Sequence, residues 1–260
     1  GFCAGCPHRA TYWSIKNALQ LDNRQGFATY DIGCYAMARG PSGYYQLRVG
    51  GAMGTGTGLA SGFGKFSSMG FEQPVIAMCG DSTFFHSAMP ALVNAHYNKS
   101  NLVMMILDNS ATAMTGFQPH PGVGTNAMGD EVTPVDIERV CRAFGAKVEV
   151  TDPFDIPGTR DKLLQALEDP EGAKVLVVRR RCQMLKGKDE KPPYRVFVDS
   201  GKCIGEDCGC DRVCTRVFKC PGLIWDPKEG KSKVDEVICV GCGVCADICP
   251  EGAIIKEETK

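Results

Sequence analysis

The stretches that decide the fold are residues 75–83 (VIAMCGDST) and 102–109 (LVMMILDN). Each is a short apolar run that ends in polar residues, which is typical of a strand buried on both faces of a parallel sheet. Similar runs lie at residues 146–150 and 174–178. Helical patterns separate them at residues 86–98, 134–144 and 158–168. This alternation predicts an α/β domain whose parallel sheet has helices on both faces.

A glycine-rich stretch at residues 50–64 (GGAMGTGTGLASGFG) precedes the first of these runs. It predicts a loop followed by a helix that packs closely on its neighbours. Its GxGxG content is a weak signal, because close backbone packing accounts for it as well as contact with a phosphate does.

The composition excludes several classes of protein. The chain has 260 residues, with 29 Lys and Arg against 30 Asp and Glu, so its net charge of −1 argues against a nucleic-acid-binding protein. Hydrophobic residues make up 43%, which is enough for a core. We expect no membrane span, since no apolar run reaches the roughly 18–20 residues that a transmembrane helix needs.

The segment at residues 179–193 (RRRCQMLKGKDEKPP) breaks the helix–strand alternation, because it is charged and holds two prolines. We therefore expect a first domain at residues 1–185, a linker at 186–193 and a second domain at 194–260. A domain as small as the second cannot build a large apolar core and needs another source of stability.

Cysteine is the unusual residue, with 15 in all and nine of them between Cys203 and Cys249. Composition alone allows a disulfide framework, structural zinc or iron–sulfur clusters. The chain opens without a recognisable signal peptide, and six cysteines are dispersed over the first 182 residues. These features favour an intracellular protein, and we expect it in the cytoplasm.

The spacing of the last four cysteines is C-x2-C-x2-C-x3-C, followed by Pro250. This is the bacterial ferredoxin spacing, in which three cysteines bind one [4Fe–4S] cluster and the fourth binds a second. Zinc sites usually use two separated C-x2-C pairs, so iron–sulfur is favoured. The four residues are Cys239, Cys242, Cys245 and Cys249.

A second half-motif lies upstream and also closes with Cys-Pro. It contains five cysteines where four suffice, so that either Cys208 or Cys210 is the spare; the five are Cys203, Cys208, Cys210, Cys214 and Cys220. One interpretation is a degenerate half that has lost its cluster. We favour two [4Fe–4S] clusters with Cys220 and Cys249 exchanged between the halves, so that residues 194–260 resemble a 2[4Fe–4S] ferredoxin domain, a small α+β fold.

Polar residues that follow the first two apolar runs match a cofactor signature. Gly80-Asp81-Ser82 and Asp108-Asn109 resemble the thiamine diphosphate signature GDG…NN, in the form GDS…DN. The Asp81 carboxylate and the Asn109 side-chain oxygen are hard ligands of the kind that Mg²⁺ prefers. Ser82 and Thr83 open a helix and present backbone N–H groups to the diphosphate. A turn between strand and helix would explain GDS alone, but Asn109 on the next strand favours the cofactor.

Four motifs extend this resemblance over most of residues 1–182. They are CAGCPHR at the start, DIGCY at residues 31–35, GDSTFFHS at 80–87 and LDNSATAMTGFQPHPG at 107–122. Together they resemble the thiamine-binding half of the large subunit of indolepyruvate:ferredoxin oxidoreductase and, more broadly, the 2-oxoacid:ferredoxin oxidoreductases. The N-terminal half of that subunit has no counterpart here, so the chain is either a fragment or a subunit of a more divided enzyme.

The resemblance implies bound thiamine diphosphate and Mg²⁺, with the backbone carbonyl of Ala111 as a third metal ligand. The residues that it assigns to the cofactor are Gly80, Asp81, Ser82, Thr83, Asn109, Ala111, Thr112 and Met114.

The resemblance also implies a third [4Fe–4S] cluster beside the thiamine. Its ligands would be Cys3, Cys6, Cys34 and Cys182. By spacing alone, Cys3 and Cys6 are a zinc or redox pair, and the other two are buried thiols. We expect the remaining two cysteines, Cys79 and Cys141, to lie in the core.

Two histidines fall within the cofactor motifs. His86 follows Ser82 by four residues, and His120 lies in QPHPG. Each is a candidate catalytic proton donor or carboxylate partner, although a lone histidine is more often structural.

The function implied by the resemblance is thiamine-dependent oxidative decarboxylation of a 2-oxoacid, an arylpyruvate such as indolepyruvate. Coenzyme A accepts the acyl group, CO₂ leaves, and single electrons pass through three [4Fe–4S] clusters to an external ferredoxin. The glutamate that activates the pyrimidine would come from another subunit. This implies a hetero-oligomer whose separate subunits are inactive. Alternatives are another 2-oxoacid (pyruvate, branched-chain or phenylglyoxylate), a pure electron-transfer subunit, and a non-oxidative decarboxylase.

Overall fold

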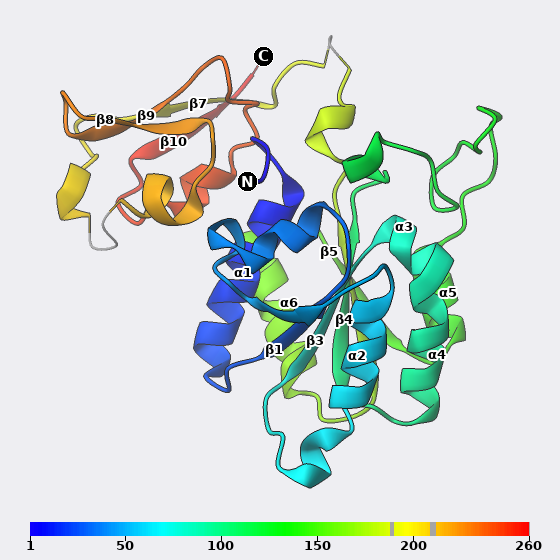
Figure 1. Ribbon diagram of the computed structural model, residues 1–260. Coiled ribbons are helices and arrows are strands. Elements are labelled where there is room, and N and C mark those ends of the chain that lie inside the picture. Colours follow the sequence, from blue (N-terminus) through cyan, green and yellow to red (C-terminus); the bar gives the residue numbers. More distant parts are fainter. Residues whose placement is uncertain (188–189, 209–211, 260) are drawn as a thin grey trace. The chain divides into compact units, whose positions relative to one another are not determined.

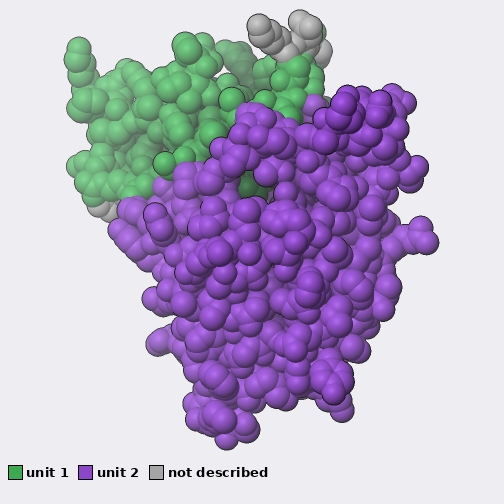
Figure 2. Space-filling model, turned by 45° about the vertical axis from the view of Figure 1, so that its right-hand side comes forward, with its two compact units in different colours: residues 1–10, 183–260 green, residues 11–182 purple. Residues whose placement is uncertain are grey.

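The computed structural model describes residues 1–187, 190–208 and 212–259. The chain divides into two compact units, which Figure 2 distinguishes by colour. We call Thr11–Cys182 the sheet unit, and Gly1–Ala10 together with Gln183–Lys260 the cysteine unit. No pattern in the sequence indicates that the first ten residues group with the C-terminal segment. Within the expected linker, residues 188–189 lie outside the described residues.

The sheet unit is built on six parallel strands in the order β2-β1-β3-β4-β6-β5. The strands are β1 (Phe27–Tyr30), β2 (Leu47–Gly50), β3 (Val75–Gly80), β4 (Leu102–Asp108), β5 (Lys147–Thr151) and β6 (Ala173–Arg179). The predicted strands correspond to β3, β4, β5 and β6. The sequence analysis missed β1 and β2, because runs of four residues are too short to show a period.

Helices cover both faces of this sheet, as predicted (Figure 1). One face carries α2 (Thr55–Phe63), α4 (Met89–Tyr97) and α5 (Ile137–Ala143), and the other carries α1 (Pro7–Asp22) and α6 (Ile156–Glu168). Alternate residues of β3, β4 and β6 pack with the first group of helices in one apolar core. None of the described helices is both long and apolar enough to cross a bilayer.

The helix that follows β3 begins where Ser82 and Thr83 were expected to open one, ahead of the helical pattern at residues 86–98. It starts at α3 (Asp81–Thr83), passes through a π-helical turn at Phe84–Ala88 and continues as α4. Its first turn therefore lies directly at the carboxyl end of β3. π-helical turns inside helices are frequent at functional sites.

The glycine-rich stretch forms a loop and then α2, which approaches the strands closely. A Cβ atom at Gly56 would lie 2.9 Å from the Tyr30 carbonyl carbon and 3.0 Å from the Met78 oxygen. Only glycine allows this approach, so close packing accounts for this part of the stretch.

The cysteine unit consists of short elements. Strand β7 (Tyr194–Val198) pairs antiparallel with β10 (Ile254–Glu258), and β8 (Leu223–Asp226) pairs antiparallel with β9 (Lys231–Val234). A π-helical turn at Val213–Phe218 belongs to the same unit. Across both units, the described residues form 3-10 turns at Cys34–Arg39, Pro41–Gly43, Phe66–Met69, Ala113–Thr115, Gln183–Leu185, Gly205–Asp207 and Val244–Ile248.

Candidate thiamine site and cysteine groups

Charged and polar residues gather at the carboxyl edge of the sheet. Asp31 follows β1, Asp81 follows β3, Asp108 ends β4 and Arg179 ends β6. The chain order of the strands reverses between β1 and β3, and ligands bind open α/β sheets at such a point. The three carboxylates are buried, which marks this edge as the candidate site.

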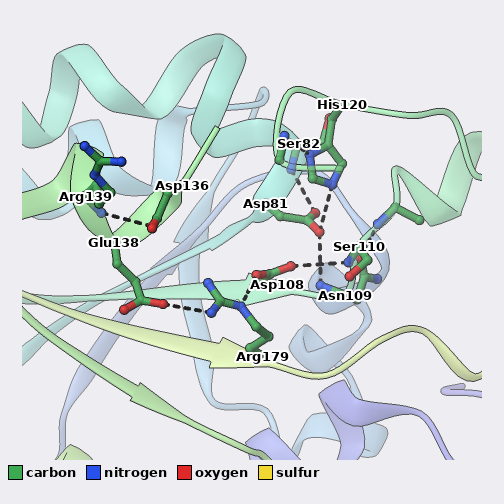
Figure 3. Close-up of polar contacts among 12 residues, drawn as sticks. Asp81, Ser82, Asp108, Asn109, Ser110, His120, Asp136, Glu138, Arg139 and Arg179 are labelled. Atoms are coloured by element: carbon green, nitrogen blue, oxygen red, sulfur yellow. Dashed lines mark hydrogen bonds and ion pairs between the residues drawn. The ribbon is translucent and has the colours of Figure 1, made fainter. Parts of the chain in front are cut away.

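Asp81 joins the ends of β3 and β4 (Figure 3). Its Oδ1 accepts a hydrogen bond from the Ser82 N–H at 2.8 Å, and its Oδ2 accepts one from the Asn109 N–H at 3.0 Å. The Asn109 Oδ1 accepts one from the Ala111 N–H at 3.3 Å. The structure thus brings together Asp81, Asn109 and Ala111, the three residues predicted to hold Mg²⁺.

The donor atoms at this place suit a hard cation. Asp81 is only 2% exposed, and both its carboxylate and the Asn109 amide offer oxygen atoms. Ser82, one of the two predicted phosphate-binding residues, already donates its N–H to Asp81. Ala111 is buried, whereas Met114 is half exposed on the loop that follows. In that loop the N–H of Thr112 donates to the Gln118 carbonyl at 3.1 Å.

Asp108 and Asn109 have separate environments although they are adjacent. Arg179 Nε donates to Asp108 Oδ2 at 2.7 Å, and Arg179 Nη1 donates to Glu138 Oε1 at 2.8 Å (Figure 3). Burial raises the pKa of Asp108, and the bond from Arg179 opposes that rise. The sequence analysis missed Arg179 and Glu138, because the pairing depends on strand register.

His120 lies against Asp81, with its Nε2 3.1 Å from Asp81 Oδ2. Its Nδ1 accepts a hydrogen bond from the Gly122 N–H at 3.1 Å, so the ring proton of the neutral form is on Nε2 and faces Asp81. The imidazole ring stacks on the Phe85 ring, with 5.7 Å between the two ring centroids. The other candidate, His86, is exposed on the π-helical turn, and the described residues give it no hydrogen bond to Asp81 or Asn109.

Asp31 is a buried acid that the sequence analysis did not single out. Tyr35 OH donates to its Oδ1, and the Gly54 N–H donates to its Oδ2 at 3.0 Å. Burial raises the pKa of Asp31 to about 6, against the effect of these two bonds. The glycine-rich loop is therefore tied to a carboxylate at the end of β1. Asp31 is the first residue of the motif DIGCY, in which the sequence analysis assigned a role only to Cys34.

In the cysteine unit, four cysteines line one cavity. They come from both half-motifs and are Cys203, Cys208, Cys214 and Cys249. Burial raises the pKa of the Cys214 thiol, and the charges of Cys249 and Cys203 add to the rise. Cys208 is thus one of the group, while Cys210 lies outside the described residues.

A second group of four cysteines combines Cys220 with three cysteines of the later motif. The pKa of Cys245 is raised by burial and then by the charges of Cys242, Cys220 and Cys239. This arrangement matches the exchange of Cys220 and Cys249 that the repeated Cys-Pro predicts. No three of the described His, Cys, Asp and Glu side chains stand in the geometry of a bound metal, so the groups identify neighbours rather than coordination.

Backbone donors already point at sulfur in both groups. The Gly241 N–H donates to Cys239 Sγ at 3.5 Å, and the Ala253 N–H donates to Cys249 Sγ at 3.3 Å. Such bonds tune iron–sulfur clusters. Gly241 has φ of +64°, and a Cβ there would lie 2.2 Å from the Tyr194 carbonyl oxygen, so this turn requires glycine.

The six remaining cysteines fall into three pairs. Cys3 and Cys6 belong to the cysteine unit, and Cys34 and Cys182 belong to the sheet unit. The Cys182 N–H donates to the Asn109 carbonyl at 2.9 Å, which ties this cysteine to the candidate thiamine site. Cys79 and Cys141 are fully buried, which confirms the prediction that they lie in the core.

Comparison with known proteins bears on both units. Residues 31–178 match the family model described as thiamine pyrophosphate enzyme, C-terminal TPP binding domain, and residues 232–255 match a 4Fe-4S binding domain. The indolepyruvate oxidoreductase subunit IorA of Methanothermobacter thermautotrophicus is 37% identical over 98% of this chain, and that of Pyrococcus horikoshii is 38% identical over 98%. These relatives confirm the resemblance found in the sequence. The chain spans 40% of the length of each.

A solved structure shows the same fold. The 2-oxoglutarate:ferredoxin oxidoreductase of Magnetococcus marinus matches with a TM-score of 0.61 at 17% identity, over 73% of this chain and 66% of that one.

Proposed function

Since the chain belongs to the thiamine pyrophosphate enzymes, with the C-terminal TPP-binding domain at residues 31–178, we propose that it is part of a 2-oxoacid:ferredoxin oxidoreductase. We propose an arylpyruvate such as indolepyruvate as the substrate, because the relatives named above are indolepyruvate oxidoreductase subunits. Coenzyme A is the acyl acceptor, and a ferredoxin is the electron acceptor.

One observation carries the proposal: a single chain holds both a buried oxygen-donor site and eight gathered cysteines. Asp81 and Asn109 meet at the carboxyl edge of the sheet, which suits a metal-bound diphosphate. The two cysteine groups suit a pair of [4Fe–4S] clusters, and clusters of this kind move electrons singly. A carrier protein does not need the first feature, and a simple decarboxylase does not need the second.

Mg²⁺ would be held by Asp81, Asn109 and the carbonyl of Ala111, with the diphosphate nearby. When bound, thiamine diphosphate supplies the carbanion chemistry that breaks the bond between the 2-oxo carbon and the carboxylate. Asp81 binds the metal and keeps the ends of β3 and β4 together through its bonds to Ser82 and Asn109. Arg179 holds Asp108, so Asn109 alone of this adjacent pair is directed to the metal.

His120 Nε2 lies 3.1 Å from Asp81 Oδ2, and Phe85 covers one face of the imidazole ring. The buried imidazole thereby shields the Asp81 carboxylate from water. Asp31 fixes the glycine-rich loop through the Gly54 N–H, which sets the wall of the site next to β1. His86 remains a candidate for contact with substrate from the exposed side of the helix.

Packing within the cysteine unit supports an order for the proposed electron path. A Cβ at Gly5 would lie 2.4 Å from Val240 Cγ2, so the turn between Cys3 and Cys6 packs on the loop between Cys239 and Cys242. A cluster with Cys3 and Cys6 among its ligands would therefore pass electrons first to a cluster held by the Cys220 group. A cluster held by the group that includes Cys203 would come next and would pass electrons to the external ferredoxin.

The remaining parts of the enzyme lie outside this chain. The glutamate that activates the thiamine pyrimidine comes from another subunit, so the working enzyme is a hetero-oligomer. Cysteine thiolates that bind clusters need a reducing compartment, for which we propose the cytoplasm.

The experiment is an anaerobic assay of the full-length protein with its partner subunit, against a panel of 2-oxoacids with coenzyme A and a viologen dye. We expect dye reduction to be fastest with indolepyruvate or another arylpyruvate, and thiamine diphosphate to be released on denaturation. Preference for pyruvate would contradict the substrate assignment. CO₂ release without dye reduction would indicate a non-oxidative decarboxylase, and absence of thiamine diphosphate would indicate a pure electron carrier.

A further inference from the structure

Arg9 is a buried cation without an acidic partner among the described residues. It lies in the first turn of α1 within the cysteine unit and is 3% exposed. Its Nη1 donates to the Phe218 carbonyl at 2.8 Å, and its Nη2 donates to the Phe2 carbonyl at 2.5 Å. Its Nε is buried and has no hydrogen-bond partner.

This arrangement is unfavourable for an isolated polypeptide. A buried charge costs several kcal/mol unless an opposite charge or a full set of hydrogen bonds offsets it. The two carbonyls supply partial negative charge, and the rings of Phe2 and Phe218 each lie 5.7 Å from the guanidinium carbon. Neither contact neutralises a whole positive charge, so the site calls for an anion that the described side chains do not provide.

The positions of the two carbonyls identify this anion. Phe2 directly precedes Cys3, and Phe218 stands two residues before Cys220. Arg9 is therefore bonded to the two segments that present predicted cluster ligands. A [4Fe–4S] cluster with four thiolate ligands carries net negative charge, and nearby charge is one of the factors that set its reduction potential.

We propose that Arg9 is a positioning residue that ties the Cys3–Cys6 turn to the Cys220 segment and supplies the counter-charge of the cluster held by Cys220, Cys239, Cys242 and Cys245. The inference rests on the proposed function, because it requires that cluster. One-electron reduction adds a negative charge, which the buried guanidinium stabilises. Arg9 therefore raises the reduction potential of the cluster that would receive electrons next after the thiamine side.

A second arginine of this unit has a different environment. Arg212 lines the cavity of the Cys203 group, but it lies 3.8 Å from Glu206 and covers the ring of Trp225 at 4.3 Å. Its Nε is also buried without a hydrogen-bond partner among the described residues, but a carboxylate and a ring face offset part of its charge. Only Arg9 of the two leaves a charge for a cluster to balance.

The test is a redox titration of the full-length protein with its partner subunit, followed by electron paramagnetic resonance under anaerobic conditions. In Arg9→Gln we expect iron and sulfide content to stay at the wild-type level. The equilibrium constant for reduction of one cluster should fall roughly tenfold, which lowers its reduction potential by about 59 mV for a one-electron couple. The matched control is Arg195→Gln, which removes the same charge at an exposed position of this unit and should shift no cluster by more than a third of that.

Wild-type potentials in an Arg9→Gln protein with full cluster content would overturn the role of Arg9 and leave the proposed function standing. Lack of iron and sulfide in the wild-type protein would instead overturn the proposed function, and this inference with it. If Arg9→Gln does not assemble, Arg9→Lys decides, because it keeps the charge and loses one carbonyl contact. We expect wild-type potentials in Arg9→Lys, and a tenfold fall there would overturn the proposal.

Discussion

The two units of the chain are stabilised by different means. The sheet unit contains one large apolar core, in which β3, β4 and β6 pack with α2, α4 and α5. The cysteine unit has short strands and few buried apolar side chains; its buried hydrophobics other than cysteine are Phe2, Ala10, Val196, Val213, Phe218, Leu223, Val244, Ile248, Ala253 and Ile254. A segment of this size needs another source of stability, and its cysteine groups supply the ligands for one. We therefore expect burial to stabilise one unit and metal binding to stabilise the other.

The largest expected effect separates the chemistry of the two units. In the full complex, Asp81→Ala removes the carboxylate that joins β3 to β4 and would bind Mg²⁺. We expect dye reduction to fall by at least about a hundredfold, since metal and diphosphate lose their main anchor. Thiamine diphosphate content should fall with it, while iron content stays unchanged.

Asp161→Ala is the matched control, because Asp161 is an exposed carboxylate of α6 in the same unit. It should keep both cofactor content and rate. An Asp81→Ala protein with normal bound thiamine diphosphate would show that the cofactor is held elsewhere.

The second effect is selective unfolding on removal of iron. A chelator under reducing, anaerobic conditions should unfold the cysteine unit and leave the sheet unit folded, because only the former depends on metal. The chain has two tryptophans, Trp13 in the sheet unit and Trp225 in the cysteine unit, which report on each separately.

Two variants isolate these signals. In Trp13→Phe, the emission of Trp225 should shift to the red as iron leaves, whereas in Trp225→Phe the emission of Trp13 should stay constant. Loss of both signals together would mean that the sheet unit also depends on the clusters, and the comparison between the units would fail.

The third effect concerns a buried charge in the sheet unit. Lys174 is buried at the start of β6, where its Nζ donates to the Asp169 carbonyl at 2.8 Å. Burial lowers its pKa from 10.5 to about 8. Between pH 8 and 10.5 the native state loses this proton before the unfolded state does, so the unfolded state binds more protons and stability rises with pH.

The free energy of unfolding should rise by on the order of 2 kcal/mol over that pH range. The measurement is urea unfolding of wild type and Lys174→Met, and the rise is the change in the difference between them. Lys65→Met removes an exposed lysine and should follow the wild-type curve. Parallel curves for wild type and Lys174→Met would show that the amine is solvated.

How far the sequence could predict each unit depends on how local the signal is. Strands β3 and β4 and the residues Asp81 and Asn109 were predictable, since each signal lies within a few residues. The pairing of Asp31 with Gly54 was not, because it depends on which strands are neighbours. The same holds for Arg179 with Asp108, where the register of β6 against β4 decides the contact.

In the cysteine unit, the exchange of Cys220 and Cys249 that the repeated Cys-Pro predicts stays a prediction, and the two groups of neighbouring cysteines support it. The choice between Cys208 and Cys210 stays open, because the cavity includes Cys208 while Cys210 lies outside the described residues. That residues 1–10 pack with a segment some 200 positions later was beyond the sequence, because a contact of such separation leaves no periodic signal.

The smallest predicted effect tests that long-range contact. Gly5 has φ of +66°, and its Cβ would collide with Val240 Cγ2 at 2.4 Å. Gly5→Ala therefore costs both the left-handed strain of about 1–2 kcal/mol and the displacement of the Cys239–Cys242 loop. Gly252→Ala is the matched control, since Gly252 has φ of +58° with nothing within 4 Å and costs the strain alone.

The difference between the two variants, about 1 kcal/mol in the urea unfolding of the cysteine unit, measures the contact itself. Trp225 fluorescence reports it, and Val240→Ala combined with Gly5→Ala should recover most of the difference by making room for the new methyl group. If both glycine variants lose the same stability, the Cys3–Cys6 turn does not pack on this loop, and the electron path loses its first step within the cysteine unit.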